Sequence, residues 1–337
     1  MRKPNLSPFF LTLAFLLGVA FLIRDNYLLA MWFGFAIAGY SAIANDSIQT
    51  LGAFLSSNSK KTWIGQWLFM GGIFLISTIW SWENYNGDVS HQRLLAKGFD
   101  KAPQSFTFLQ LAAPILLLAL TRFRIPVSTT FLLLSCFATT PAAIGSMTMK
   151  SVMGYVIAFG LSFLIWNIAE RISQRVGEVN AQNPIWVPVQ WCATGLLWSV
   201  WLMQDMANVA VFLPRSLTSD ELIFFLVFIF SGLGVLFYKR GEAIQKVVEE
   251  KSNLDRVTSA TFLVIVYAII LWVFKIHSKI PMSTTWVFIG LLAGRELALH
   301  HKEKKAKKMI RRDLAAVFIG FAFSIFLAFM SNPSMTF

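Results

Sequence analysis

Two aspartates lie inside long apolar stretches of this chain, and each has side-chain amides beside it. Asp46 directly follows Asn45 and precedes Gln49 by three residues, within an apolar stretch over residues 28–57. A carboxylate in such surroundings is costly to bury, so it generally marks a functional site. Carboxylate and amide oxygens together form the kind of ligand set that suits a hard cation such as Na⁺.

The same set recurs 159 residues later, at Asp205 in the stretch 185–214. A single polar residue could simply hydrogen-bond between helices, but two sets at matching positions favour a function. The aspartates expected to bind sodium are Asp46 and Asp205. The amide residues expected to contact the substrate, with the two asparagines shared by the cation, are Asn45, Gln49, Gln204 and Asn208.

A second repeated motif is Pro-x-Ser-Thr-Thr, at residues 126–130 and 281–285. Proline suits the first turn of a helix, and Ser or Thr hydroxyls satisfy free backbone groups there. A helix N-terminus also offers N–H donors and a positive dipole end to an anion. Ordinary capping would leave the same motif, but its duplication favours an oxyanion site. The residues expected to contact the anion are Ser128, Thr129, Thr130, Ser283, Thr284 and Thr285.

The two motif types together suggest coupled binding of a cation and an oxyanion. Removing water from a phosphate is costly, and protein donors must replace that water. A bound Na⁺ beside the anion offsets its charge at low dielectric. A protonated carboxylate would do the same, so proton coupling is the alternative to sodium.

Composition places these motifs in a membrane protein. The chain has 337 residues, of which 56% are hydrophobic and 14% charged, whereas soluble domains carry about 25% charged residues. The formal net charge is +12. Because the basic residues lie mostly between apolar runs, we attribute them to cytoplasmic loops and anionic lipid rather than to nucleic acid.

The hydropathy pattern predicts an all-α integral membrane protein with about eleven segments. The predicted segments are 9–23, 28–57, 62–82, 105–120, 125–145, 149–169, 185–214, 221–238, 257–274, 280–299 and 313–330. The first is interpreted as a membrane helix rather than a signal peptide, because no small-x-small cleavage site follows it. The two longest segments hold the aspartates, which predicts discontinuous helices there.

Charge counting predicts the orientation. With a cytoplasmic N-terminus and an external C-terminus, 20 Lys and Arg residues fall at inner ends and 8 at outer ends, as the positive-inside rule favours. Five segments per unit then make the second unit inverted relative to the first. The predicted divisions are an N-terminal helix (1–27), repeat 1 (28–169), a cytoplasmic linker (170–184) and repeat 2 (185–337).

Other features are assigned structural roles. Cys136 and Cys192 are expected to be buried small hydrophobes rather than a disulfide. Residues 83–104 are expected to form an exterior loop and residues 239–256 a short cytoplasmic helix. The basic run 302–312 is expected to lie at anionic headgroups.

At these motifs the chain resembles the PiT family of inorganic phosphate transporters, which carry duplicated Gly-Ala-Asn-Asp-x-x-Asn-Ala and Pro-x-Ser-Thr-Thr signatures. The matching residues are Ala44-Asn45-Asp46, Asp205-x-x-Asn208, Pro126-Val127-Ser128-Thr129-Thr130 and Pro281-Met282-Ser283-Thr284-Thr285. The departures are Ile43 for glycine, Gln49 and Gln204 for asparagine, and Phe131 and Trp286 for the histidine that often follows Ser-Thr-Thr. The chain therefore resembles a divergent member.

The resemblance implies a sodium- or proton-coupled symporter of inorganic phosphate, with inverted repeats and a site between the halves. It also implies a possible homodimer, and no organic cofactor is expected. Sulfate or another oxyanion is the alternative substrate. A passive channel is a further alternative. An intramembrane aspartyl enzyme is disfavoured, because neither aspartate lies in a Gly-x-Gly-Asp context.

Overall fold

The computed structural model describes residues 7–123, 125, 127–138, 141–176, 183–239, 257–277, 283–300 and 304–331. Across these residues the regular structure is helical and contains no strand. The helices of the first half are α1 (Ser7–Ile23), α2 (Tyr27–Ser57), α3 (Trp63–Asn84), α4 (Arg93–Ala96), α5 (Phe108–Arg122), α6 (Thr129–Ser135) and α7 (Pro141–Val176). Those of the second half are α8 (Trp186–Asp205), α9 (Ala207–Ala210), α10 (Ser219–Tyr238), α12 (Val257–Leu271) with a π-helical extension to His277, α13 (Thr284–His300) and α14 (Lys304–Ser331).

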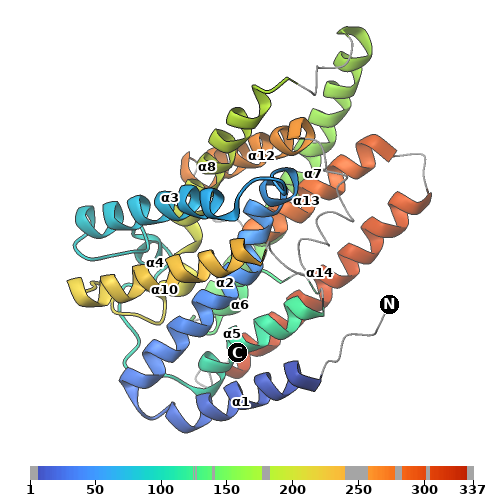
Figure 1. Ribbon diagram of the computed structural model, residues 1–337. Helices are drawn as coiled ribbons and strands as arrows, with labels where there is room; N and C mark the ends of the chain where they lie inside the picture. Colours follow the sequence, from blue (N-terminus) through green and yellow to red (C-terminus); the bar gives the residue numbers. More distant parts are fainter. Residues whose placement is uncertain are drawn as a thin grey trace.

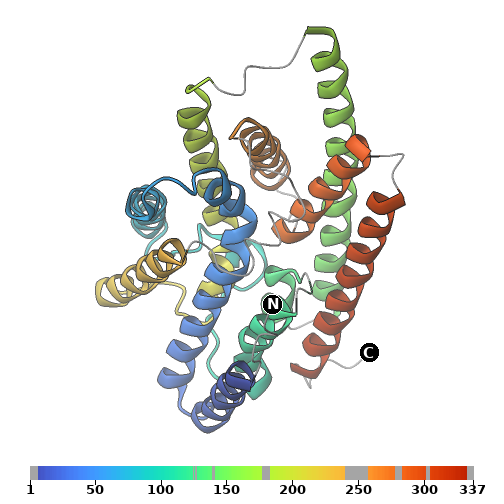
Figure 2. The ribbon, with the colours of Figure 1, turned by 45° about the vertical axis from the view of Figure 1, so that its right-hand side comes forward.

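Helix α2 lies at the centre of the fold (Figure 1), in contact with α1, α5, α6, α8, α9, α10, α12 and α13. Helices α3 and α10 lie together on one side of α2, and α14 lies on the other side (Figures 1 and 2). Helix α7 runs alongside α13, and α8 runs alongside α12 (Figure 2). The main apolar core surrounds α2 and α8, and a second core joins α7, α8, α12 and α13.

Five helical stretches are long and apolar enough to cross a membrane, judged by length and composition. Within the described residues these stretches are Tyr27–Asp46, Trp63–Asn84, Met147–Ile172, Ser219–Tyr238 and Val257–Phe274. Three shorter apolar helices accompany them, at Pro8–Ile23, Phe108–Arg122 and Val317–Ser331. Large apolar side chains are also exposed on outer helices, as at Leu22 (80%) and Ile76 (73%). These features are compatible with a membrane-embedded protein.

The two aspartate segments differ from each other in continuity. Helix α2 is unbroken through Asp46, so the predicted discontinuity in the first copy is wrong. The hydroxyl of Thr50 donates to the carbonyl of Asp46 (3.3 Å), one turn back along the same helix. In the second copy α8 ends at Asp205 and the short α9 begins at Ala207, as predicted. The sequence pattern of the two copies therefore does not fix whether the helix breaks.

A partly buried cation, Arg215, helps the chain leave the helix after α9. The guanidinium of Arg215 donates to the carbonyls of Ala210, Val211 and Leu213 (3.4, 3.4 and 2.7 Å). The carbonyl of Ala210 also accepts from the N–H of Leu213 (3.0 Å), and the charged donor adds hydrogen bonds at the end of the helix, where carbonyls lack a following turn. Arg215 also donates to the carbonyls of Phe99 and Lys101 (2.8 and 2.9 Å). One side chain thus joins the α9–α10 connection to the α4–α5 connection.

Several other predicted segments have different bounds in the structure. The predicted segment 125–145 is not one helix, because α6 ends at Ser135 and α7 begins at Pro141. Helix α7 continues to Val176, into the predicted linker 170–184. Helix α14 begins at Lys304 and so includes most of the basic run. Residues 1–6, 240–256 and 301–303 lie outside the described residues, as does most of the predicted cytoplasmic helix.

The predicted exterior loop, residues 83–104, contains α4 and is tied to α3. The carboxylate of Asp88 accepts from the backbone N–H groups of Ser90 and Gln92 (2.7 and 2.6 Å). The hydroxyl of Ser81 donates to the carbonyl of Asp88 and accepts from the N–H of His91 (2.7 and 3.0 Å). His91 and Gln92 adopt left-handed backbone conformations, with φ of 52° and 57°. Such non-glycine residues cost free energy, and the hydrogen bonds around Asp88 hold them in place.

The two cysteines differ in exposure. Both are free thiols, so the expectation that they form no disulfide is confirmed. Cys136 is buried as predicted, whereas Cys192 is exposed and the prediction for it is wrong. Cys192 lies on an apolar helix, α8, whose pattern does not show which face meets another helix.

The contact between α7 and α13 depends on two glycines four residues apart, Gly290 and Gly294. A Cβ at Gly294 would collide with the carbonyl oxygen of Phe159, and one at Gly290 with that of Tyr155. Small residues at this spacing let two membrane helices approach closely. The hydroxyl of Ser162 also donates to the carbonyl of Leu291 across this contact (2.6 Å). This contact positions α13, which begins at the second Ser-Thr-Thr motif.

We expect Gly294→Ala to destabilise the protein by about 1–3 kcal/mol, because an added methyl group must displace the α7 backbone. Thermal unfolding in detergent measures the change. Gly160→Ala is the matched control, since nothing lies within 4 Å of a Cβ at Gly160 in α7. An equal effect of both substitutions would contradict the role assigned to this contact.

A partly buried histidine, His91 in the loop over residues 83–104, makes stability depend on pH. Burial lowers the pKa of His91 from 6.5 to about 4, partly opposed by Asp88. Below pH 6.5 the unfolded chain therefore binds a proton that the folded protein does not. Unfolding becomes easier as pH falls from 6.5 towards 4, by up to about 1.4 kcal/mol per pH unit. Melting temperatures of the wild type and His91→Gln, measured over this pH range, test the expectation, and the melting temperature of the variant should depend less on pH. The same pH dependence in both proteins would exclude this role of His91.

Candidate functional site

The structure brings the motifs of both halves to one place beside the centre of α2. Asp46 lies within α2, Asp205 is the last residue of α8, and Thr129 and Thr130 are the first residues of α6. The side chains of both aspartates are fully buried, with 0% exposure. Burial of two carboxylates requires hydrogen-bond donors around them.

Thr129 supplies such a donor to the first aspartate. Its hydroxyl donates to Oδ1 of Asp46 (2.7 Å) and accepts a hydrogen bond from Nδ2 of Asn45 (3.0 Å). Asn45 also donates to Oδ1 of Asp46 (3.1 Å). Asn45, Asp46 and Thr129 therefore form one closed set of hydrogen bonds.

Thr130 has the same role for the second aspartate. Its hydroxyl donates to Oδ1 of Asp205 (3.0 Å) and accepts from Nδ2 of Asn208 (3.0 Å). Two successive threonines of the first half thus hold the carboxylates of the two halves. Thr129 donates to the aspartate of its own half, whereas Thr130 donates to the aspartate of the other half.

The second Ser-Thr-Thr run also contacts the opposite half. Nε2 of Gln49 donates to the hydroxyl of Thr285 (3.2 Å). Gln49 and Asn208 each lie three residues after an aspartate, and Thr285 and Thr130 are each the third hydroxyl residue of a run. The two cross-half hydrogen bonds therefore join equivalent positions, each donated by an amide to a threonine.

The serines of the two runs begin helices, as the sequence predicted. The hydroxyl of Ser128 accepts from the N–H of Phe131 (3.1 Å), and that of Ser283 accepts from the N–H of Trp286 (3.3 Å). Each serine keeps its own O–H available to donate. The two prolines, at positions 126 and 281, lie outside the described residues.

The amide side chains leave three buried oxygens without a hydrogen-bond partner among the described residues. These atoms are Oε1 of Gln49, Oε1 of Gln204 and Oδ1 of Asn208. A buried acceptor without a donor costs about 1–3 kcal/mol. Three such acceptors near two carboxylates form a region of negative potential, which a bound cation would satisfy through oxygen ligands.

Two residues that the motifs did not reveal also contribute to the site. The hydroxyl of Tyr267, on α12, donates to the carbonyl of Thr284 (3.0 Å) and so positions the first turn of α13. Arg93, on α4, has a pKa that burial lowers and that the charge of Asp205 raises in opposition, and its Nε has no hydrogen-bond partner among the described residues. A tyrosine in an apolar helix and an arginine in a polar loop are both common, so neither gave a signal in the sequence.

The basic residues near the Ser-Thr-Thr runs have other contacts. The guanidinium of Arg122 lies 5.8 Å from the centre of the Phe9 ring. Arg295 and Glu296 form an ion pair with each other, with 3.1 Å between Nη1 and Oε1. Neither arrangement directs a charge at the carboxylates.

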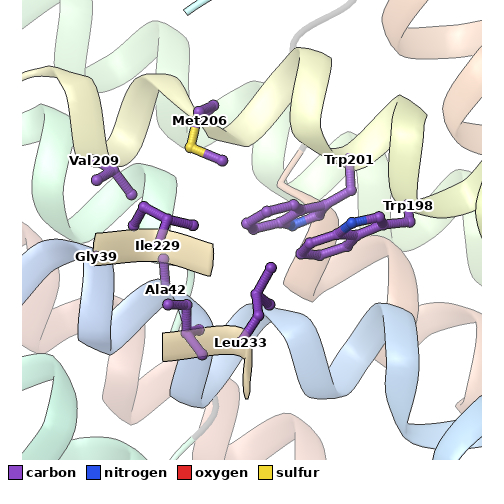
Figure 3. A pocket seen from close by; sticks show the side chains of 9 residues that line it. Gly39, Ala42, Trp198, Trp201, Met206, Val209, Ile229 and Leu233 are labelled. Carbon is purple, nitrogen blue, oxygen red and sulfur yellow. The ribbon is translucent and has the colours of Figure 1, made fainter. Parts of the chain in front are cut away.

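A small apolar cavity lies next to the polar cluster, between α2, α8 and α10 (Figure 3). Its lining includes Met206, directly after Asp205, and the stacked rings of Trp198 and Trp201, whose centroids are 4.8 Å apart. No charged side chain lines it. An ion would lose its hydration there without gaining ligands, so the candidate site is the polar cluster and not this cavity.

Comparison with known proteins gives no match to a protein-family model, to a curated protein or to a solved structure.

We expect Thr130→Val to destabilise the protein by about 1–3 kcal/mol, because Asp205 and Asn208 would each lose a buried partner. Thr130→Ser keeps the hydroxyl and should lie near the wild type. Thr121→Val is the control, since the hydroxyl of Thr121 bonds only to the carbonyl of Leu117 in its own helix (2.8 Å). Thermal unfolding in detergent ranks the variants; equal losses for both valine substitutions would exclude the role assigned to Thr130.

Proposed function

We propose that this protein is a secondary transporter that couples the symport of inorganic phosphate to sodium by alternating access. The observation that carries the proposal is the meeting of both aspartate motifs and both Ser-Thr-Thr runs through equivalent hydrogen bonds. A site built from both halves of a duplicated chain is the usual arrangement in transporters with internal repeats.

The helix contacts support a duplicated architecture after α1. We equate α2 with α8, α3 with α10, α5 with α12, α6 with α13, and α7 with α14. The contact of α2 with α5 then corresponds to that of α8 with α12, and the contact of α2 with α10 to that of α8 with α3. The contact of α7 with α13 likewise corresponds to that of α14 with α6.

In this proposal the second repeat is inverted and the N-terminus is cytoplasmic. About eleven segments enter the membrane. At seven residues α6 spans only about 10 Å, so it enters without crossing. Motion of one repeat against the other would expose the shared site to each side in turn.

The cation would bind at the carboxylates and the free amide oxygens. Asp46 and Asp205 supply charge, and the three buried amide oxygens supply neutral ligands. Sodium binding would satisfy acceptors that otherwise reduce stability, which gives a physical reason for the cation to bind. No organic cofactor has a role in this proposal.

The anion would bind at the hydroxyl groups of the two runs. Without a cation the hydroxyls of Thr129 and Thr130 donate to the carboxylates. A cation on those carboxylate oxygens repels the hydroxyl protons and turns them towards the anion. Cation binding therefore creates anion donors, and this links the two substrates.

The buried acceptors also favour phosphate over sulfate. Phosphate keeps a proton near neutral pH and can donate it to a carboxylate or an amide oxygen, whereas sulfate has no proton to donate. A site with unsatisfied acceptors discriminates strongly for the ligand that satisfies them. An acid–base dyad is less well supported, because each aspartate accepts from a different threonine.

The test is uptake of radiolabelled phosphate into proteoliposomes, with and without an inward sodium gradient. We expect the wild type to accumulate phosphate only with the gradient. Asp46→Asn should lower the rate at least about tenfold, the equivalent of about 1.4 kcal/mol. Asp25→Asn is the control and should be unaffected, since the side chain of Asp25 is 87% exposed.

Uptake that persists without sodium and shows no preference for phosphate would reject the proposal. Unlabelled sulfate should compete weakly. Competition by sulfate as strong as that by phosphate would instead support a general oxyanion permease. Uptake driven by a proton gradient in the absence of sodium would identify protons as the coupling ion of that permease.

A further inference from the structure

A second group of polar side chains lies at the Ser57 end of α2, away from the proposed site. We name it the amide network, and its members are Ser57, Asn58, Gln66, Gln190 and Trp191. Asn58 caps the end of α2, Gln66 lies in the first turn of α3, and the last two lie near the start of α8. The three amide residues are buried, each at 4% exposure or less.

Hydrogen bonds within the amide network join the two halves of the chain directly. Nδ2 of Asn58 donates to Oε1 of Gln190 (2.8 Å), and the indole of Trp191 donates to Oδ1 of Asn58 (3.1 Å). Nε2 of Gln190 donates in turn to the hydroxyl of Ser57. The nitrogen and the oxygen of both amides therefore have partners in the opposite half.

The same residues are also tied to their own helices. Nε2 of Gln66 donates to the carbonyl of Asn58 (3.0 Å), which joins the end of α2 to the start of α3. The ring of Trp191 lies 5.0 Å, between centroids, from each of the rings of Phe54 and Phe69. The amide network thus holds the ends of α2, α3 and α8 together.

The amide network differs from the proposed site in how its groups are satisfied. All the side-chain amide groups of Asn58 and Gln190 are hydrogen-bonded within the protein. In the proposed site, by contrast, three buried amide oxygens have no partner among the described residues. A ligand is needed to complete the site but not the network, so the network serves the contact between the halves.

The position of the amide network places it at the edge of the membrane. Residues 59–61, which follow Asn58, and residues 183–185, which precede α8, are exposed. Lys60 and Lys61 are among the basic residues that the positive-inside rule assigns to the cytoplasm. Under the proposed function the network therefore lies at the cytoplasmic end of the contact between α2 and α8.

The helices that meet in the amide network also carry the two carboxylates. From Asp46 to Ser57 α2 rises about 16 Å, and from Gln190 to Asp205 α8 rises about 22 Å. The two helices contact each other. Because a helix is stiff over such lengths, separation of their ends at the network changes access to the site.

We propose that the amide network is an inner latch, closed in this structure, which opens when sodium and phosphate are released to the cytoplasm. This inference rests on the proposed function. The chemistry of the network suits a contact that opens and closes. Its amides exchange protein partners for water at small net cost, whereas an apolar contact would expose its whole surface to water.

A cross-link that holds the latch closed is the first test. In a Cys192→Ser background, a bifunctional methanethiosulfonate joins the thiols of Asn58→Cys/Gln190→Cys in proteoliposomes; the other native thiol, Cys136, is buried. Cross-linking should lower sodium-driven phosphate uptake at least about tenfold, because the inner end cannot open. A reductant should restore uptake. Asn58→Cys/Gln66→Cys is the matched control, since it joins helices of the same half and should keep its uptake.

Uptake that continues after mass spectrometry has shown the cross-link between positions 58 and 190 would overturn the latch and leave the proposed function intact. Equal losses in the control pair would also overturn it, since the effect would not be specific to the contact between the halves. A wild type without sodium-driven phosphate uptake would reject the proposed function and the latch with it.

If the double variants do not transport before cross-linking, labelling of Ser57→Cys decides, again in a Cys192→Ser background. An impermeant maleimide is added on the cytoplasmic side. Saturating sodium and phosphate should raise the labelling rate about tenfold, because cycling populates the open latch. Lys60→Cys is the control, since residue 60 is already exposed and its rate should not depend on the ligands. A rate at Ser57→Cys that does not respond to the ligands would overturn the inference.

Discussion

The burial of two carboxylates at the centre of an apolar molecule is the constraint on which the rest of the structure depends. Asp46 and Asp205 are both without exposure, and each accepts a hydrogen bond from a threonine hydroxyl. Those threonines are adjacent, so the start of α6 must lie between α2 and the end of α8. The positions of three helices follow from the need to supply donors to two charges.

This constraint also explains why the polar groups of the cluster are so unevenly satisfied. The amide nitrogens of Asn45, Gln49 and Asn208 each donate to a threonine hydroxyl, whereas three amide oxygens remain unpaired among the described residues. A protein selected for stability alone would pair these acceptors. Under the proposed function the free acceptors leave room for a ligand, at a cost in stability when the ligand is absent.

The connection between α3 and α5 and the connection between α9 and α10 are as strongly fixed as the helices they join. Arg215 binds five backbone carbonyls from two connections, and the loop before α4 contains consecutive left-handed residues held by Asp88. Membrane loops need no such fixation to link two helices. The fixation joins the first half of the chain to the second, because Arg215 bonds to the carbonyls of Phe99 and Lys101.

Sequence by itself determined the helical class, the presence of several long apolar stretches and the polar residues that meet beside α2, because these polar residues recur in two copies. The sequence also predicted that Ser128 and Ser283 cap the starts of α6 and α13, since helix capping involves residues close together in the chain. Only the tertiary structure decided that α2 continues through Asp46 while α8 stops at Asp205. It also decided that Thr130 reaches across to the aspartate of the other half. These features depend on contacts between residues far apart in the chain, and no local pattern encodes such contacts.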